Sequence, residues 1–519
     1  MEHSTADVVI VGGGHNGLVA ATYLAQAGKT VTLLERLDHV GGAAVSAEAF
    51  SGVDARLSRY SYLVSLLPER IIRELKLDIR LERRRYASYT PLPGTDHGLL
   101  VDNADADATA ASFASVGAAD DVAPWREFYE GTTTLARALF PTVCEPLLTR
   151  SEAKRAVGDD ALWNSIIERP IGETIESTFS NDLVRGVVLT DALIGNFVSA
   201  HDEGLAGNRC FLYHVIGGGT GDWDVPVGGM GAVTGELARA ASEAGATLLT
   251  NAEVVSLTPE GEVRYLLDGE ERAITADRVL VNVAPYVLDS LLGNAPSVAR
   301  PEGAQVKVNL MLSRLPRLRD ENIDPAAAFG GTFHINEGYT QLQAAFDAAS
   351  AGTVPSPLPS EIYCHTLADP SILSPELQAS GAHTLTVFAL HAPDRLLTPE
   401  NNDEMRAVLQ QAVVDSLNSV LAEPIEDVLM RDADGKLCIE TKTTLDIEEA
   451  LRMPGGNIFH GPLSWPFVED DASLSSPAER WGVATAHERI LLCGSGARRG
   501  GAVSGLGGHN AAMAVLESQ

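Results

Sequence analysis

A glycine-rich turn between an apolar run and an Ala-rich run constrains this chain more than any other feature. Residues 7–11 have the pattern of a buried strand, and Gly12-Gly-Gly-His-Asn-Gly17 follows directly. Residues 18–27 then have helical character, and the apolar run 30–34 ends in Glu35. Strand, turn, helix, strand and acid in this register predict a Rossmann-type unit that holds the phosphates of a dinucleotide at the helix N-terminus.

The residues of this unit have separate physical roles. Gly12 permits the tight turn, Gly14 lets the backbone approach a pyrophosphate, and Gly17 lets the helix pack closely on the strand. Glu35 can accept both ribose hydroxyls and would repel a 2′-phosphate, so the adenosine half is predicted to belong to FAD or NAD and not to NADP. The cofactor-binding residues predicted here are Gly12, Gly14, His15, Asn16, Gly17 and Glu35, with the His-Asn pair orienting backbone and not catalysing.

A second glycine pair follows the acid. Glu35-Arg36 precedes Gly41-Gly42-Ala43-Ala44, and this segment resembles the extended dinucleotide motif of the FAD-dependent amine oxidase and phytoene desaturase superfamily. In that superfamily the second glycine pair lets the backbone pass close to the pyrophosphate and ribityl chain. The resemblance therefore implies FAD, with Arg36, Gly41, Gly42 and Ala43 among the residues that bind it.

A matching glycine-rich segment lies near the other end of the chain. Residues 489–494 have the pattern of a buried strand, residues 495–505 are rich in glycine, and residues 510–516 are predicted to be helical. Backbone donors in such a segment would stabilise negative charge on flavin N1 and O2. We expect the flavin contacts at Gly494, Gly501, Ala502, Val503 and Gly505.

Further motifs extend the resemblance over nearly the whole chain. The segments 58–63, 228–231, 455–461 and 493–496 look like those of phytoene-desaturase-related flavoproteins. The closest subgroup resembles pyridine nucleotide-disulphide oxidoreductase domain-containing protein 2. One departure is Arg498-Arg499, which stands where the family commonly has His-Pro and adds two charges near the predicted flavin.

Two features argue against a second nucleotide cofactor or thiol chemistry. Gly217–Asp222 lacks the third glycine of a Rossmann fingerprint and is interpreted as a loop at a domain junction, so stable NAD(P) binding is not expected. The five cysteines are far apart and include no CxxC pair, which excludes dithiol redox chemistry and a cysteine-type zinc site. No metal ligand is predicted.

The predicted fold class is α/β, with a discontinuous Rossmann-type FAD-binding domain and a substrate domain that has a mixed or antiparallel sheet and helices. The FAD-binding domain is predicted to comprise residues 1–90, 215–290 and 450–519, and the substrate domain residues 91–214 and 291–449. The resemblance implies that backbone near Val254 clasps the adenine. Predicted elements include a helix from Pro124, at its first position, to Leu139, and strands 306–312 and 383–390.

Charge and hydropathy exclude several partners. The 38 Lys and Arg against 70 Asp and Glu give a net charge of −32, which disfavours nucleic acid and anionic membranes. Only six of the basic residues are Lys, and both high-GC codon usage and a salt-adapted acidic surface remain explanations of this preference for Arg. Scattered cysteines, no apolar run of about 18 residues and no room for a signal peptide predict a cytoplasmic protein without a membrane span. Homo-oligomer formation stays open.

The predicted function is that of an FAD-dependent oxidoreductase, whether dehydrogenase, desaturase or oxidase. It would remove a hydride from a C–H bond of an apolar substrate, isoprenoid- or carotenoid-like or another small organic molecule, to flavin N5, with oxygen or a quinone-like carrier as acceptor. His460 and Tyr62 are the catalytic candidates, although a loop histidine and a core tyrosine are the plainer interpretations. A small-molecule amine oxidase and a non-redox binding or escort protein on an FAD-type fold are the alternatives.

Overall fold

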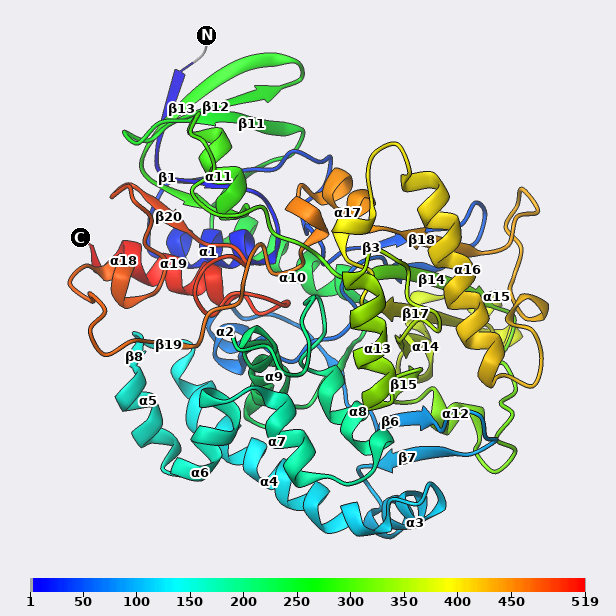
Figure 1. Cartoon of the computed structure of the whole chain (residues 1–519). Helices are drawn as coiled ribbons and strands as arrows, with labels where there is room; N and C mark the ends of the chain where they lie inside the picture. The colour runs from blue at the N-terminus through cyan, green and yellow to red at the C-terminus, as the bar shows by residue number, and fades with distance from the viewer. Residues whose placement is uncertain (1–2, 519) are drawn as a thin grey trace.

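The computed structural model describes residues 3–518 and contains two large sheets (Figure 1). The first sheet consists of β1 (His3–Val11), β2 (Val31–Leu34), β10 (Thr247–Leu249), β11 (Ala252–Leu257), β12 (Glu262–Leu267), β13 (Glu270–Val281) and β20 (Ile490–Leu492). Its order is β10-β2-β1-β13-β12-β11, and β20 also pairs with β13. Val11, Leu34 and Val281 are neighbours in parallel register, so three strands end at the edge where the glycine turn begins.

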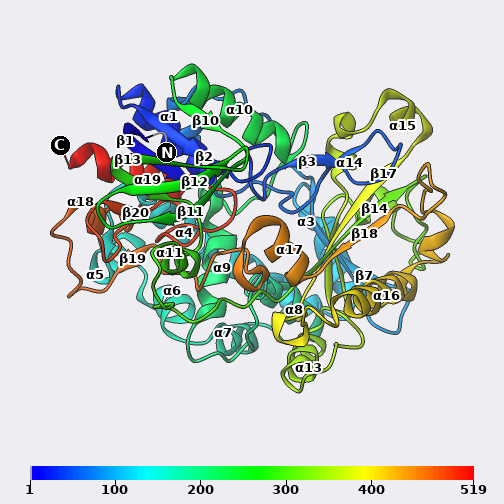
Figure 2. The ribbon, with the colours of Figure 1, turned by 90° about the horizontal axis from the view of Figure 1, so that it is seen from above.

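The second sheet is mostly antiparallel. It consists of β6 (Tyr86–Pro91), β7 (Gly98–Asp102), β14 (Val306–Leu312), β15 (Thr332–Ile335), β16 (Ser360–Tyr363), β17 (His383–Ala389) and β18 (Ile439–Lys442). Its order is β18-β14-β17-β16-β15-β6-β7, and only the β15–β6 pair among the described residues of this sheet is parallel. Figure 2 shows the two sheets in separate parts of the molecule.

Helices and short ribbons complete the chain. The helices of the first half are α1 (His15–Gln26), α2 (Glu69–Glu74), α3 (Ala106–Ser115), α4 (Val122–Leu139), α5 (Arg150–Val157), α6 (Asp160–Trp163), α7 (Ile171–Thr178), α8 (Asp182–Thr190), α9 (Ala206–Ile216) and α10 (Met230–Glu243). Those of the second half are α11 (Pro285–Leu291), α12 (Pro325–Ala328), α13 (Tyr339–Ser350), α14 (His365–Ala368), α15 (Pro375–Ser380), α16 (Asn402–Val420), α17 (Thr444–Leu451), α18 (Pro477–Arg480) and α19 (Leu506–Glu517). Short strand pairs join β3 (Ser46–Glu48) to β4 (Arg56–Ser58), β5 (Leu81–Glu82) to β9 (Val225–Pro226) and β8 (Leu148–Thr149) to β19 (Phe467–Val468).

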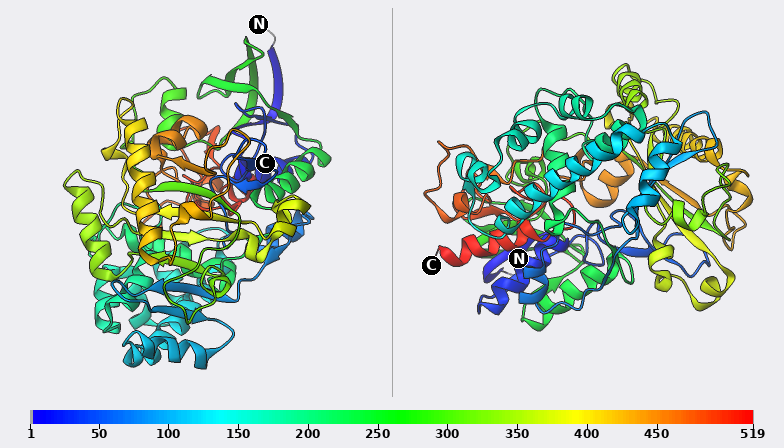
Figure 3. Two further views of the ribbon diagram at one scale, coloured as in Figure 1. Left: turned by 90° about the vertical axis from the view of Figure 1, so that its right-hand side faces the viewer. Right: turned by 90° about the horizontal axis from the view of Figure 1, so that it is seen from below.

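The described residues form five hydrophobic clusters, and the three largest hold these layers together. One core joins α1, α10 and α19 to the first sheet, a second joins α16 to the second sheet, and a third lies among α3 to α9. The helices α1 and α19 pack closely, because a Cβ at Gly508 would lie 1.9 Å from the Asn16 carbonyl oxygen. Figure 3 shows the first strand and the green strands β11–β13 extending away from the main body.

The predicted fold class is confirmed, with small shifts in the boundaries. The first helix begins at His15 and not at residue 18, and α4 begins at Val122, so Pro124 is the third helical residue. Proline is tolerated there because the N–H groups of the first turn have no partner within the helix. The strand β6 crosses the predicted domain boundary at residue 90 and belongs to the second sheet. Every helix within residues 3–518 is too short or too polar to traverse a bilayer.

Candidate functional site: a backbone cradle beside a cavity

The turn after β1 brings α1 against the sheet by means of glycine. Gly12 has φ +101°, and its N–H donates to the Leu34 carbonyl at 2.8 Å. A Cβ at Gly17 would lie 2.4 Å from the Gly12 carbonyl oxygen, which is closer than real contacts allow. Any side chain at Gly17 would therefore push α1 away from β1 and displace its N-terminus.

The N-terminus of α1 carries polar groups without partners. Its N-cap is Gly14, which has no side chain to accept the free N–H groups of the first turn. Asn16 is 1% exposed, yet neither amide atom of its side chain has a hydrogen-bond partner, and His15 Nε2 has none either. Burial lowers the pKa of His15 to about 4, so its ring is neutral. Such a terminus suits a phosphate group.

The second glycine pair forms the opposite wall of this cradle. Gly41 pairs with Gly14 as a parallel bridge, and its N–H donates to the Gly13 carbonyl at 2.8 Å. Gly42 has φ +59°, and a Cβ there would lie 3.1 Å from Gly14 Cα. Two loops thus meet backbone to backbone, and main chain forms much of the cradle between them.

Glu35 lies where the cradle meets β2 and β11. Its carboxylate accepts the N–H of Gly13 at 2.7 Å and of Leu37 at 2.8 Å, one at each oxygen. Each oxygen keeps a second lone pair for a ligand hydroxyl. The N–H of Ala252 donates to the Glu35 carbonyl, which places Val254 two residues farther along the same strand. The Arg36 guanidinium donates to the Ala450 carbonyl at 2.6 Å.

The C-terminal segment closes the cradle against a cavity of about 470 Å³. Gly501, Ala502 and Val503 line the cavity, and so does Ala43. Gly501 and Ala502 both have positive φ, +99° and +51°, so this segment turns sharply. Gly494 and Gly505 do not line it. A Cβ at Gly494 would lie 2.9 Å from Asn282 Oδ1, and one at Gly505 would lie 3.0 Å from Val19.

Arg498 and Arg499 in this segment donate hydrogen bonds to main-chain carbonyls of other segments. Arg499 is 1% exposed and donates to the carbonyls of Thr142, Glu145 and Trp481. The Arg498 guanidinium donates to the Phe467 carbonyl at 2.8 Å. Neither arginine lines the cavity. The placement of these two charges near the flavin stays a prediction, and both guanidinium groups donate to main-chain carbonyls outside the cavity lining.

The opposite wall of the cavity comes from the second sheet and the helices. The Tyr62 and Tyr363 rings lie with their centroids 4.5 Å apart at an interplanar angle of 37°, and the Phe388 centroid lies 6.5 Å from that of Tyr62. Lys307 is 2% exposed, lies 4.1 Å above the Tyr62 ring and donates to the Tyr60 carbonyl at 2.8 Å. Burial holds the pKa of Lys307 well below its usual range. The cavity therefore offers an aromatic wall with one buried amine.

Comparison with known proteins shows the family to which this chain belongs. A family model described as flavin containing amine oxidoreductase matches residues 63–350, and one described as NAD(P)-binding Rossmann-like domain matches residues 10–67. The chain belongs to the flavin containing amine oxidoreductase family. It is 55% identical to the uncharacterized protein Rv0897c of Mycobacterium tuberculosis, over 98% of this chain and 97% of that protein. It is 29% identical to pyridine nucleotide-disulfide oxidoreductase domain-containing protein 2 of Mus musculus, over 98% and 93%.

Solved structures agree on the fold. Putrescine oxidase bound to putrescine superposes with a TM-score of 0.55 at 16% identity, covering 99% of this chain and 98% of that one. Cyclohexylamine oxidase from Brevibacterium oxydans superposes with a TM-score of 0.54 at 14% identity, covering 99% and 100%. The predicted relationship is confirmed, and the chain is an FAD-dependent oxidoreductase whose cradle fits the cofactor.

The two catalytic candidates occupy different positions. Tyr62 lines the cavity, and burial raises the pKa of its hydroxyl well above the usual value, with Glu361 as the next cause. His460 does not line the cavity. Its Nδ1 is buried without a partner, and burial lowers its pKa to about 4. Both roles stay predictions, and the geometry favours Tyr62 for contact with a substrate.

Sequence reasoning missed the most polar part of the cavity wall. Lys307 and Glu361 each lie within a strand of mostly buried residues. A charged residue inside an apolar strand is the sequence signal that could have identified them as candidates. Asp191 follows α8 and lines the same wall, where burial raises its pKa to about 8. Burial also raises the pKa of Glu337, which Glu361 raises further. These acids come from distant segments of the chain, so no local sequence motif predicts that they lie together.

Proposed function

We propose that this chain removes a hydride from a C–H bond of a small, largely apolar organic substrate enclosed between the cradle and the second sheet. FAD, when bound, would supply the hydride acceptor at N5, with oxygen or a quinone-like carrier as the final electron acceptor. The observation that supports this proposal is the shared cavity. Gly501 and Ala502 form one wall of it, and Tyr62 and Phe388 form part of another.

The chain's own residues would position the substrate and exclude water. Aromatic rings at Tyr62, Tyr363 and Phe388 offer flat apolar contact, which orients a substrate without a covalent step. Lys307 holds the Tyr60 carbonyl and keeps its ammonium or amine group at the cavity. Because its pKa is lowered, a neutral amine is available there to accept a proton released during oxidation.

Oxidation of a small amine is the second candidate. The partly buried Asp191 carboxyl lines the cavity, and an ammonium group bound beside it would favour its charged form. This candidate differs from the first only in the polar end of the substrate. A non-redox escort role is not proposed, since the chain is a member of an oxidoreductase family.

Anaerobic reduction of the FAD-loaded protein tests the proposal. A panel of alkenes, isoprenoid alcohols and primary alkylamines would be mixed with the protein in the absence of oxygen, and the loss of oxidised-flavin absorbance recorded. We expect one class to bleach the flavin in a saturable manner, and readmitted oxygen or an added quinone to restore it. Failure of every class to bleach a flavin that dithionite does reduce would contradict the proposed reaction.

A further inference from the structure

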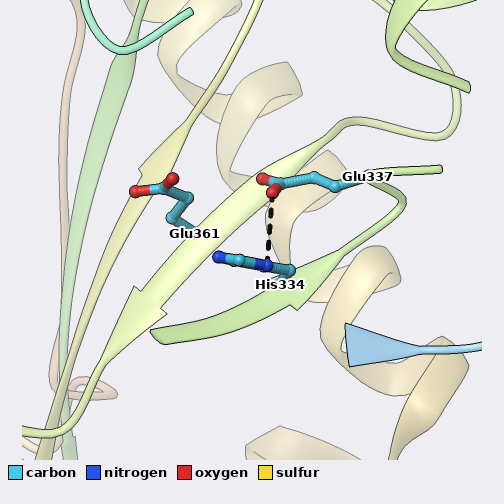
Figure 4. Close-up of side chains that lie close together, drawn as sticks. All are labelled: His334, Glu337 and Glu361. Carbon is cyan, nitrogen blue, oxygen red and sulfur yellow. Dashed lines mark ion pairs between the residues drawn. The ribbon is translucent and has the colours of Figure 1, made fainter. Parts of the chain in front are cut away.

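A buried histidine and two glutamates meet at the wall of the cavity (Figure 4). His334 in β15 and Glu361 in β16 are direct cross-strand partners, so their side chains project from the same face of the second sheet. Glu337 lies in the loop after β15 and faces His334, with its Oε2 3.9 Å from His334 Nδ1. One ligand atom from each residue lies within 4.8 Å of the others.

Glu337 is the member of this cluster whose burial is not explained by a hydrogen bond. It is 1% exposed, and neither carboxylate oxygen has a hydrogen-bond partner. The helix α8 covers it tightly, because a Cβ at Gly186 would lie 1.8 Å from the Glu337 carbonyl oxygen. A buried carboxylate without a donor or a cation is costly, so this group either carries a proton or takes a positively charged partner.

The neighbouring side chains hold the other two members in place. Glu361 accepts the hydroxyl of Thr190 at 3.0 Å through Oε1 and the hydroxyl of Tyr363 through Oε2. The hydroxyl of Thr90 lies 3.1 Å from His334 Nδ1. Carboxylate and imidazole ligands of metal ions are oriented by outer hydrogen bonds of this kind.

The charges that face the cluster do not neutralise it. Asp191 adds a third carboxyl group close enough to affect Glu361 and Glu337. Arg84 is the facing cation, but its guanidinium donates to the Trp223 carbonyl and to Thr332 Oγ1 instead of to any of these acids. The cluster therefore brings carboxyl groups together without a hydrogen bond from the facing guanidinium.

We propose that His334, Glu337 and Glu361 bind one divalent transition-metal ion of the Mn²⁺, Fe²⁺ or Zn²⁺ class. One imidazole and two carboxylates form a donor set that suits these ions better than Mg²⁺ or Ca²⁺. His334 and Glu361 line the cavity, which provides an entry path and leaves coordination positions open toward it. Binding requires the donor atoms to draw together slightly and releases any protons that the carboxyl groups carry. The inference does not depend on the proposed reaction.

Titration with Mn²⁺ tests the site on the complete, FAD-loaded protein. The protein would be treated with a chelator and dialysed, and Mn²⁺ then added while the free-ion signal is followed by electron paramagnetic resonance. We expect one Mn²⁺ bound per chain, displaced by Zn²⁺, and an increase in Tm on binding because the ion binds only the folded state. Glu337→Gln should lower the affinity by more than about 10-fold, since even outer-shell partners of metal sites contribute 10-fold or more.

A second buried carboxylate provides a matched control. Asp369 is 4% exposed and lies 3.1 Å from the His365 ring, but it also accepts the N–H of Gly228. Asp369→Asn should lower Tm and leave Mn²⁺ affinity unchanged. Glu337→Gln should instead raise the Tm of the metal-free protein and abolish the increase caused by Mn²⁺. Glu361→Gln, in a different strand, gives the same Mn²⁺ readout if Glu337→Gln does not fold.

Three results would overturn the proposal. The first is the absence of stoichiometric binding of either Mn²⁺ or Zn²⁺ by the native protein. The second is unchanged affinity in Glu337→Gln and Glu361→Gln. The third is an equal loss in Asp369→Asn, which would show that any buried carboxylate affects binding indirectly.

Discussion

The cofactor cradle and the cavity wall are built in opposite ways. In the cradle, Gly14, Gly41 and Gly42 bring main chain against main chain, and the first N–H groups of α1 have no N-cap side chain to accept them. In the wall, the chemistry rests on side chains such as Lys307 and Glu361, carried by strands of the second sheet. A site built from backbone tolerates almost no added side chain, whereas a site built from side chains should tolerate substitutions that keep their volume.

The largest expected effect comes from a side chain added to the cradle. Gly17→Val should abolish FAD binding, because its Cβ would meet the Gly12 carbonyl oxygen at 2.4 Å and displace α1. The ratio of FAD to protein after desalting measures this. Gly235→Ala in α10 is the control, since no atom lies within 4 Å of the added Cβ, and full FAD content is expected there. Normal FAD content in Gly17→Val would refute the close-packing argument.

A volume-conserving change in the wall should separate chemistry from cofactor binding. Lys307→Met should lower the limiting rate of flavin reduction by substrate about 100-fold, within the range for loss of a positioned proton acceptor, and leave FAD content unchanged. Stopped-flow reduction measures this. Lys442→Met removes a neighbouring cation that does not line the cavity, so its rate should stay near the native value. Equal rates in the two variants would exclude a role for Lys307.

The difference between the regions also explains what could be predicted from the sequence. The strand, the turn at Gly12–Gly17 and Glu35 are consecutive or nearly so, and their spacing alone specifies the geometry of the cradle. The wall combines Asp191, Lys307 and Glu361, which only the tertiary fold brings together. The same limit applies to Arg499, because two of its three carbonyl partners, Thr142 and Glu145, lie more than 350 residues away.

A smaller effect is expected where the cradle does use a side chain. Glu35→Gln should raise the Kd for FAD about 10- to 100-fold, because hydrogen bonds to a charged group contribute about 1.5–3 kcal/mol. The amide also places an NH₂ group toward one of the two backbone donors at Gly13 and Leu37. Titration of the apoprotein with FAD by fluorescence measures the change. An unchanged Kd would mean that the carboxylate serves only the local backbone.

The smallest effect concerns pH and a histidine of the wall. Burial lowers the pKa of His214 to about 4 from 6.5. Between pH 6.5 and 4 the unfolded chain binds this proton and the folded chain does not, so the residue makes stability fall as pH falls. His214→Gln should flatten that fall by up to about 1.4 kcal/mol per pH unit, and Tm measured across this range detects it. An unchanged slope would contradict a neutral, buried ring.

The central claim is that substrate occupies the cavity beside a cofactor held by the backbone cradle. Thr133 on α4 lines the cavity, whereas its neighbour Thr134 is exposed and does not. Rates of anaerobic flavin reduction by a reactive substrate in Thr133→Trp and Thr134→Trp test this claim directly. The account predicts full FAD content in both variants, a strongly slowed reduction in Thr133→Trp and a native rate in Thr134→Trp. A native rate in Thr133→Trp would contradict it.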